Sequence, residues 1–192
     1  VGARVSAGLA AWHAAYFYTR IDDMIVRRAV SSGVYEKING GDGYVHGVES
    51  ELKLRFGKQW ISTMGFTWME GYTTYDAADG SRVEEPVRTM PLTVYTALRW
   101  ESACRRFWAE AAERAVDTED RLTASDKTDT QRIPAGGTPG YAVTDLRCGW
   151  RAGKGFSLVA GVENVFDKDY RIHGSGSNEP GRNFVLSAEY RF

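Results

Sequence analysis

NFVLSAEYRF, residues 183–192, alternates between apolar and polar side chains and ends the given sequence. One face carries Phe184, Leu186, Ala188, Tyr190 and Phe192, and the other carries Asn183, Ser187, Glu189 and Arg191. Successive side chains of a β-strand point to opposite faces of the sheet. The period of two therefore predicts a strand with one apolar face and one face in water.

The same alternation recurs along the chain and predicts eight strands in all. The other seven segments are residues 12–28, 44–56, 60–72, 92–100, 105–118, 142–150 and 156–166. Residues 1–10 are interpreted as the remnant of a ninth strand. The run AEAAERA within 105–118 also fits a helix, because Ala, Glu and Arg favour helices in isolation. A lone helix among strands would have no partner face, so a strand is predicted there.

Short and long connections alternate between the predicted strands. The short connections are residues 57–59, 101–104 and 151–154, and the long ones are 29–43, 73–90, 119–139 and 167–181. A soluble sandwich has no reason to place every long loop at one end. A transmembrane barrel does, because its periplasmic turns are short and its extracellular loops are long.

Strand length and aromatic placement agree with a membrane barrel. A strand of about twelve residues that rises ~3.3 Å per residue and tilts by ~45° covers roughly 28 Å, close to the ~25 Å apolar band of such barrels. Trp and Tyr lie near the strand ends, where interface girdles place them. They are Tyr44, Trp60, Tyr72, Trp100, Trp150, Tyr170 and Tyr190. The alternative is a soluble β-sandwich that buries these rings in its core.

Composition excludes several other classes of protein. The 192 residues carry 24 basic and 25 acidic side chains, a net charge of −1, so nothing in the totals predicts a nucleic-acid partner. No apolar run reaches the ~20 residues of a membrane-spanning helix. The sequence lacks Gly-x-Ser-x-Gly, His-Glu-x-x-His and Cys-x-x-Cys, so we expect no enzyme, no cofactor and no metal site.

The segment 161–192, GVENVFDKDYRIHGSGSNEPGRNFVLSAEYRF, resembles the last two strands and last loop of TonB-dependent outer-membrane receptors. The resemblance rests on a strand that ends in Asn-x-Phe-Asp, a Tyr, and then Gly-Arg-x-Phe leading into a strand with an aromatic end. The matching positions are Asn164, Phe166, Asp167, Tyr170, Gly181, Phe184 and Phe192. Weaker similarity to earlier barrel strands extends over most of the chain.

This resemblance implies that residues 1–192 are the C-terminal part of a 22-stranded antiparallel barrel in the bacterial outer membrane. The parent protein would import a ferric siderophore or similar scarce nutrient. The family's plug domain, and the segment that engages TonB, have no match in these residues, so TonB would act through an N-terminal region outside them. The alternative is a self-contained eight-stranded barrel that serves as an anchor or adhesin.

Individual residues carry further expectations. His173, Asn178 and Arg182 lie in the last long loop and are candidates for contact with an iron chelate. Phe184, Tyr190 and Phe192 resemble the signal by which the barrel-assembly machinery recognises its clients, and the apolar face of this strand would contact membrane lipid. Asn164, Asp167 and Tyr170 are expected to have a structural role, because Asn and Asp bond local backbone at turns.

The two cysteines are predicted at the same membrane face. Cys104 falls in the short turn before the predicted strand 105–118, and Cys148 lies near the end of the following predicted strand, 142–150. A periplasmic disulfide between them is therefore allowed.

Overall fold

A computed structural model describes residues 1–153 and 155–192, which form one ten-stranded antiparallel sheet. The strands follow one another in the order β1-β2-β3-β4-β6-β7-β8-β9-β10, and β5 pairs with the upper part of β4. Their bounds are β1 Gly2–Ala7, β2 Ala10–Ser31, β3 Val34–Phe56, β4 Trp60–Asp76, β5 Arg82–Pro86, β6 Thr93–Glu101, β7 Phe107–Val116, β8 Tyr141–Gly153, β9 Phe156–Glu163 and β10 Asn183–Tyr190.

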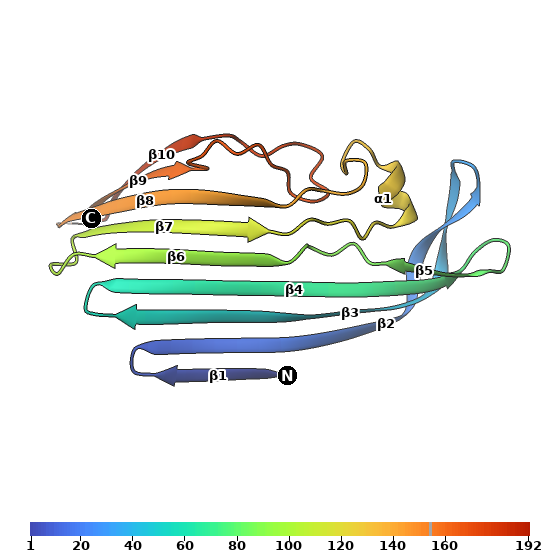
Figure 1. The fold of residues 1–192 in the computed structure, drawn as a ribbon, viewed down its shortest axis with the longest axis horizontal. Helices are drawn as coiled ribbons and strands as arrows, with labels where there is room; N and C mark the ends of the chain where they lie inside the picture. The colour runs from blue at the N-terminus through green and yellow to red at the C-terminus, as the bar shows by residue number, and fades with distance from the viewer. Residues whose placement is uncertain (154) are drawn as a thin grey trace.

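Tight turns lie at one end of the sheet and long connections at the other, as the spacing of the strands predicts (Figure 1). All eight predicted strands are present, and the predicted remnant of a ninth is β1, which pairs with β2. The Ala-rich segment is the strand β7, hydrogen-bonded to β6 and β8, so the strand interpretation is confirmed. Lys154, predicted in a short turn, lies outside the described residues.

The predicted loop 29–43 is wrong, because β2 and β3 continue through it to a hairpin turn at residues 32–33. Gly33 has φ +74°, a conformation that other residues rarely adopt. Cross-strand pairs hold the extension together: Arg28 Nε donates to Glu36 Oε1 over 2.7 Å, and the Arg27 guanidinium lies 4.0 Å from the centre of the Tyr35 ring. These strands of 22 and 23 residues are longer than a membrane crossing requires.

Two elements inside the other long connections were also not predicted. The strand β5 forms within the predicted loop 73–90, and the five-residue helix α1, Ala124–Thr128, forms within 119–139. No helix among the described residues is long and apolar enough to cross a membrane.

The register divides the sheet into an apolar and a polar face. Residues paired directly across an antiparallel sheet lie on the same side. Apolar pairs on one face are Phe56–Trp60, Trp60–Trp100, Leu98–Ala111, Phe107–Trp150, Leu146–Val162 and Phe184–Val162. Glu113 interrupts this face, beside Thr144, whose hydroxyl donates to its carboxylate over 3.4 Å.

The other face carries rows of charged side chains. Glu49 and Glu51 pair with Thr67 and Gly65 there. Arg99 Nε donates to Glu101 Oε1 over 3.0 Å, and the guanidinium lies 4.0 Å from the centre of the Trp108 ring. Paired charges on one face and apolar rows on the other suit a wall between water and lipid.

Aromatic rings gather on the apolar face at two levels. Phe56–Trp60 and Phe107–Trp150 stack beside the tight turns, with ring centres 6.4 and 6.3 Å apart. Tyr44 on β3 and Tyr72 on β4 each lie twelve residues from the tight turn between Phe56 and Trp60. For strands tilted by ~45°, this places them about 28 Å from that turn. The two rows match the predicted interface girdles.

The sheet is open rather than closed, because β1 and β10 stand at the two ends of the strand order among the described residues. This corrects the alternative of a self-contained eight-stranded barrel. The allowed disulfide is also absent, since Cys104 and Cys148 are both free and exposed. β8 continues to Gly153, so Cys148 lies opposite Ala109 within the sheet, away from the turn that holds Cys104.

Candidate functional site

Three long connections, residues 77–92, 117–140 and 164–182, gather at the end of the sheet opposite the tight turns (Figure 1). The last of them folds over the polar face. Its Tyr170 ring packs against Tyr141, with ring centres 4.4 Å apart, beside the buried Val116 and Val143. This small apolar cluster anchors the loop to the wall of the lumen.

Asn164 fastens both ends of the last loop. It is 3 % exposed and has φ +50°, which Asn tolerates better than most residues. Its side-chain amide donates to the carbonyls of Lys168 and Pro180 over 2.8 and 3.2 Å, while its Oδ1 accepts the Lys168 N–H over 2.8 Å. These three hydrogen bonds hold the backbone at both ends of the loop.

Asp167 and Gly181 form a second fastening. Asp167 Oδ1 accepts the Arg182 N–H over 2.8 Å, and the Arg182 Nε donates to the Val165 carbonyl over 2.8 Å. A Cβ added at Gly181 would lie 2.5 Å from Asp167 Oδ1, so a larger residue there would displace the Asp167 carboxylate from this position. These contacts explain why Asp167, Gly181 and Arg182 occur together in the motif.

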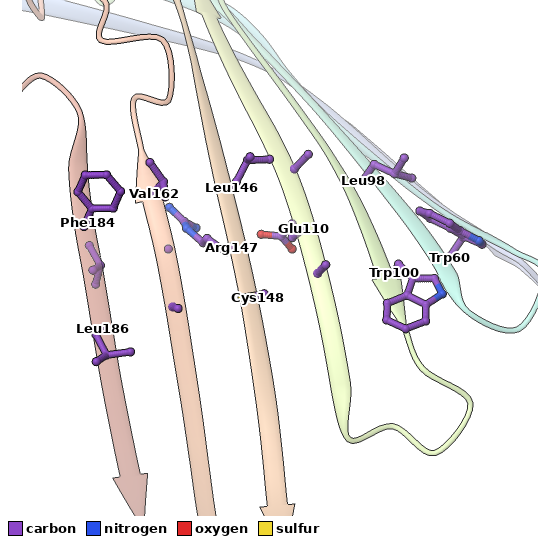
Figure 2. Close-up of a pocket in the computed structure, with 15 residues that line it drawn as sticks. Trp60, Leu98, Trp100, Glu110, Leu146, Arg147, Cys148, Val162, Phe184 and Leu186 are labelled. Atoms are coloured by element: carbon purple, nitrogen blue, oxygen red, sulfur yellow. The ribbon is translucent and has the colours of Figure 1, made fainter.

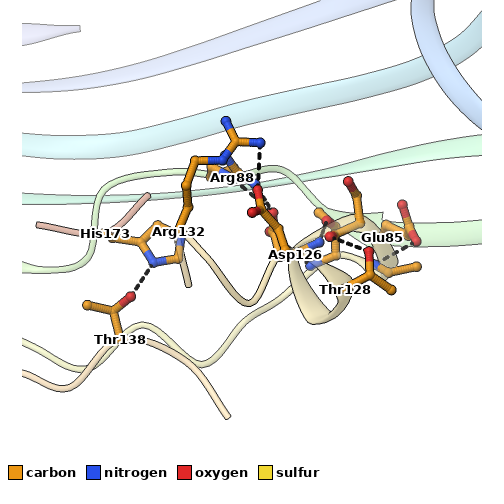
Figure 3. A network of polar contacts seen from close by, with 11 residues as sticks. Glu85, Arg88, Asp126, Thr128, Arg132, Thr138 and His173 are labelled. Atoms are coloured by element: carbon orange, nitrogen blue, oxygen red, sulfur yellow. Dashed lines mark hydrogen bonds and ion pairs between the residues drawn. The ribbon is translucent and has the colours of Figure 1, made fainter. Parts of the chain in front are cut away.

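An ion pair joins the first and second loops (Figure 3). Asp126 in α1 is 2 % exposed, and its carboxylate accepts from Arg88 Nε over 3.0 Å and from the Thr123 N–H over 3.2 Å. Thr123 Oγ1 accepts the Asp126 N–H in return, which completes a capping box at the start of α1. Burial opposes ionisation of this carboxyl, but its contacts with Arg88 and Thr123 prevail, and the pKa of Asp126 is lowered.

His173 joins the second and third loops. Its Nδ1 lies 2.9 Å from Thr138 Oγ1 (Figure 3). Thr138 in turn exchanges two backbone hydrogen bonds with Glu119. Burial of the imidazole lowers the pKa of His173, although the charges of Glu119 and Asp126 act in the opposite direction. A buried, neutral histidine is part of the loop packing here.

A polar pocket of about 400 Å³ lies beneath the last loop on the lumen face. Arg114, Asp145 and Arg147 project from β7 and β8 into its lining, and Glu179 comes from the loop above. Arg147 Nη2 lies 3.4 Å from Asp145 Oδ2. Charges of both signs next to the rings of Tyr95 and Tyr170 can hold a polar organic ligand through hydrogen bonds and ring contacts.

A larger depression, about 700 Å³, lies on the apolar face (Figure 2). Small residues such as Ala109 and Ala160 form its floor, and Trp100 and Phe184 stand on opposite sides of it. Because its lining is apolar and this face carries the aromatic girdles, the depression is not a candidate for a polar ligand.

The predicted ligand-binding residues do not converge on one point. His173 is buried between loops, whereas Asn178 and Arg182 are exposed. Asn178 accepts from Arg171 Nε over 2.9 Å and donates to Asp169 Oδ1 over 2.7 Å. No group of three or more His, Cys, Asp or Glu side chains in residues 1–153 and 155–192 is arranged to hold a metal ion.

No pattern in the sequence predicts the contacts that Arg88, Thr138 or Arg114 make, and Arg88 is expected there only as a solvated loop charge. Arg88 and Arg114 carry the charge that a polar site needs, but neither lies in a recognisable motif. Their partners are 35 or more residues away in sequence, as in Arg88–Asp126 and Thr138–His173. Only the packing of the loops brings such residues together.

The sequence model of a family described as "TonB dependent receptor-like, beta-barrel" matches residues 1–165. Among solved structures, the FrpB iron transporter from Neisseria meningitidis has a TM-score of 0.79 at 21 % identity, covering 100 % of this chain and 30 % of that one. The copper transporter OprC has a TM-score of 0.78 at 21 % identity, covering 98 % and 29 %. A mutant of the ferric enterobactin receptor from Pseudomonas aeruginosa has a TM-score of 0.69 at 22 % identity, covering 100 % and 30 %. The chain thus spans about 30 % of the length of these structures, and at such identities the likeness concerns the fold.

Proposed function

Since this chain belongs to the TonB-dependent receptor β-barrel family and forms part of a bacterial outer-membrane barrel, we propose that it is a wall segment of a receptor for nutrient uptake. The parent protein would capture a ferric siderophore or a comparably scarce nutrient outside the cell. TonB would then drive import through a plug and a TonB-engaging segment in the parent's other residues. In this proposal residues 1–192 contribute wall and extracellular loops only.

The observation that carries this proposal is the loop cluster above the polar pocket. Three loops are joined to each other by Arg88–Asp126 and Thr138–His173, and the last one is anchored to the lumen wall by Tyr170. A ligand from outside must pass this cluster before it reaches the pocket that Arg114 and Arg147 line. Loops that are held together over a lumen suit capture followed by inward transfer.

We assign direct ligand contact to exposed side chains. Asn178 and Arg182 lie at the outer surface of the last loop, and Arg114 lies in the pocket beneath it. The buried His173 supports the loop instead. Arg114 can bind an anionic group of the chelate, because guanidinium groups form strong charge-assisted hydrogen bonds with carboxylate and catecholate oxygens, while the carboxylates of Asp145 and Glu179 can accept from its donors.

The last strand has a separate proposed role in assembly. Phe184 and Tyr190 project from β10, which would remain an edge strand until the barrel of the parent closes. The Tyr190 and Phe192 rings lie 6.3 Å apart. An edge strand with free backbone groups can add to another sheet. We assign these residues to recognition by the barrel-assembly machinery. The apolar row of which they are part is assigned to contact with membrane lipid.

Uptake by cells tests the function. A strain that lacks the parent gene would be supplied with ferric catecholate, ferric hydroxamate and ferric citrate labelled with radioactive iron, and separately with Cu²⁺. We expect loss of uptake for one probe and recovery when the full-length gene is restored. Uptake that is unchanged for every probe would contradict the proposal.

Arg114→Ala then tests the pocket in the full-length receptor. We expect the half-saturating concentration of the imported probe to rise about tenfold, because a charged contact in a binding pocket is worth ~1.4 kcal/mol or more. The matched control is Arg191→Ala, since Arg191 lies at the opposite end of the wall and pairs with Glu189 over 2.7 Å. If the half-saturating concentrations of the two variants are equal, Arg114 does not contact the imported ligand.

A further inference from the structure

A third pocket, of about 370 Å³, lies where β2, β3 and β4 run side by side (Figure 1). Tyr18, Tyr44 and Tyr72 line it. The β3–β4 register is unbroken from Phe56–Trp60 to Tyr44–Tyr72, so these tyrosines share the apolar face with Trp60. The pocket therefore opens outward, away from the lumen and from the proposed uptake route.

The three rings form a continuous platform. Tyr18 and Tyr44 are stacked, with ring centres 5.7 Å apart and planes inclined by 13°. Tyr44 and Tyr72 follow at 6.2 Å and 43°. Tyr18 is 57 % exposed, so part of the platform is open to a ligand. The negative face of an aromatic ring attracts the polarised C–H groups of a sugar ring, which makes such a platform suitable for a saccharide.

The polar rim of the pocket favours a hydroxylated ligand over a phosphorylated one. Two carboxylates, Asp42 and Glu84, line it together with the hydroxyl group of Thr74. Two guanidinium groups stand at this rim, and both already have carboxylate partners. Arg20 Nε donates to Asp22 over 2.7 Å, while Arg82 donates to Asp76 over 3.3 Å and to Thr74 Oγ1 over 2.9 Å. Carboxylates accept hydrogen bonds from sugar hydroxyl groups, whereas their charge repels phosphate.

The height of the pocket matches the lipid headgroups. Arg20 lies ten residues beyond the start of β2, and Tyr72 twelve residues beyond the start of β4. With ~3.3 Å per residue and a tilt of ~45°, these positions are about 23 and 28 Å above the tight turns, at the upper limit of an apolar band ~25 Å tall. Outward-facing side chains at this level contact the heads of outer-leaflet lipids.

We propose that this pocket binds the sugar headgroup of a membrane glycolipid. The tyrosine platform stacks on one sugar ring, and Asp42, Glu84 and Thr74 accept or exchange hydrogen bonds with its hydroxyl groups. The site fixes a lipid beside the barrel wall and takes no part in uptake of the imported ligand.

Binding to the full-length receptor in detergent tests the proposal. The probes are lipopolysaccharide, the same lipopolysaccharide after enzymatic removal of its phosphates, its delipidated oligosaccharide, and phosphatidylglycerol. We expect both lipopolysaccharide forms to bind with affinities within about twofold of each other, the free oligosaccharide to bind more weakly, and phosphatidylglycerol not to compete. Loss of binding on dephosphorylation would overturn the proposal, as would equal binding of phosphatidylglycerol. Tighter binding of the free oligosaccharide would assign the site to a soluble sugar and overturn the lipid assignment.

Variants separate the pocket from the rest of the wall. We expect Tyr72→Ala to raise the Kd for lipopolysaccharide at least about tenfold, and Tyr72→Phe, which keeps the ring, to change it less than about twofold. Trp150→Ala, an aromatic truncation in the girdle beside the tight turns, is the matched control and should leave the Kd unchanged. If Tyr72→Ala does not fold, Glu84→Gln provides the test, with an expected rise of about threefold or more. If the folded variant binds lipopolysaccharide with the same Kd as the unaltered receptor, the site is refuted. Iron uptake by cells with Tyr72→Ala should be unaltered, so the two proposals can fail separately.

Discussion

Asn164 shows how much of the last hairpin depends on one side chain. It sits in a left-handed conformation at the top of β9, and its amide group holds the backbone at both ends of the loop 164–182. An amide has two donors and an acceptor, and all three are used here. Few residues tolerate this φ and carry such a group, which is why Asn occupies the position.

Replacing Asn164 by alanine should lower the free energy of unfolding by about 2–3 kcal/mol, because it removes buried hydrogen bonds and strains φ. Urea denaturation of the full-length receptor in detergent micelles measures this. Asn164→Gly relieves the strain but not the lost hydrogen bonds, so it should recover about 1 kcal/mol of the loss. Two variants as stable as the unaltered receptor would show that the amide does not hold the loop.

At the scale of elements, the loop cluster contains a buried histidine whose pKa is lowered by burial. Thr138 contacts His173, while Glu119, Asp126 and Arg88 act on its charge. Since burial lowers the pKa of His173 in the folded loops, the unfolded loops bind a proton more readily. The contribution of the neutral imidazole is complete above the ordinary pKa of ~6.5 and declines as the pH falls below it.

Acidification from pH 7.5 to 5.5 should therefore loosen the contact between the second and third loops. Hydrogen–deuterium exchange of the full-length receptor, corrected for the intrinsic effect of pH, should be several-fold faster in residues 133–140 and 170–176 at pH 5.5. In His173→Gln the side chain cannot take up the proton, so the corrected rates should be the same at both pH values. Equal pH sensitivity in the variant would rule out His173 as the titrating group.

The elements differ in how well the sequence predicts them. The alternation in 184–192 reports a strand with one lipid-facing side, and β10 follows it. The extension of β2 and β3 was mistaken for a loop, because residues such as Arg28, Glu36 and Lys37 are polar on both faces and leave no period of two. The helix α1 is too short to produce a helical period, and the contacts of Arg88 and His173 depend on loops that meet only in the folded chain.

At the scale of the whole molecule, the sheet separates an apolar face from a polar face, and a charged side chain has a different cost on each. Ala160 on β9 lies between Cys148 and Leu186 on the apolar face, whereas its neighbour Val159 lies between Gly149 and Ser187 on the polar face. Two adjacent positions on one strand therefore face lipid and water. This contrast allows the membrane assignment to be tested with a single type of substitution.

Ala160→Arg should destabilise the assembled receptor by about 2–4 kcal/mol, the cost of an arginine on the lipid face near the bilayer midplane. Val159→Arg should change the stability by less than about 1 kcal/mol, because water in the lumen solvates the charge. The amount of heat-modifiable barrel in outer-membrane fractions, together with urea denaturation, compares the two. The opposite order would mean that the faces are assigned the wrong way round.

The hairpin of β2 and β3 continues beyond Tyr18 and Tyr44 to an exposed tip at Gly33 (Figure 1). A short epitope inserted between Ser32 and Gly33 should be stained by antibody on living, unpermeabilised cells. The same epitope inserted between Gly57 and Lys58, in a tight turn, should become visible only after the outer membrane is opened. A hairpin this long would thus carry its tip clear of the membrane, within reach of antibodies, phages and proteases outside the cell.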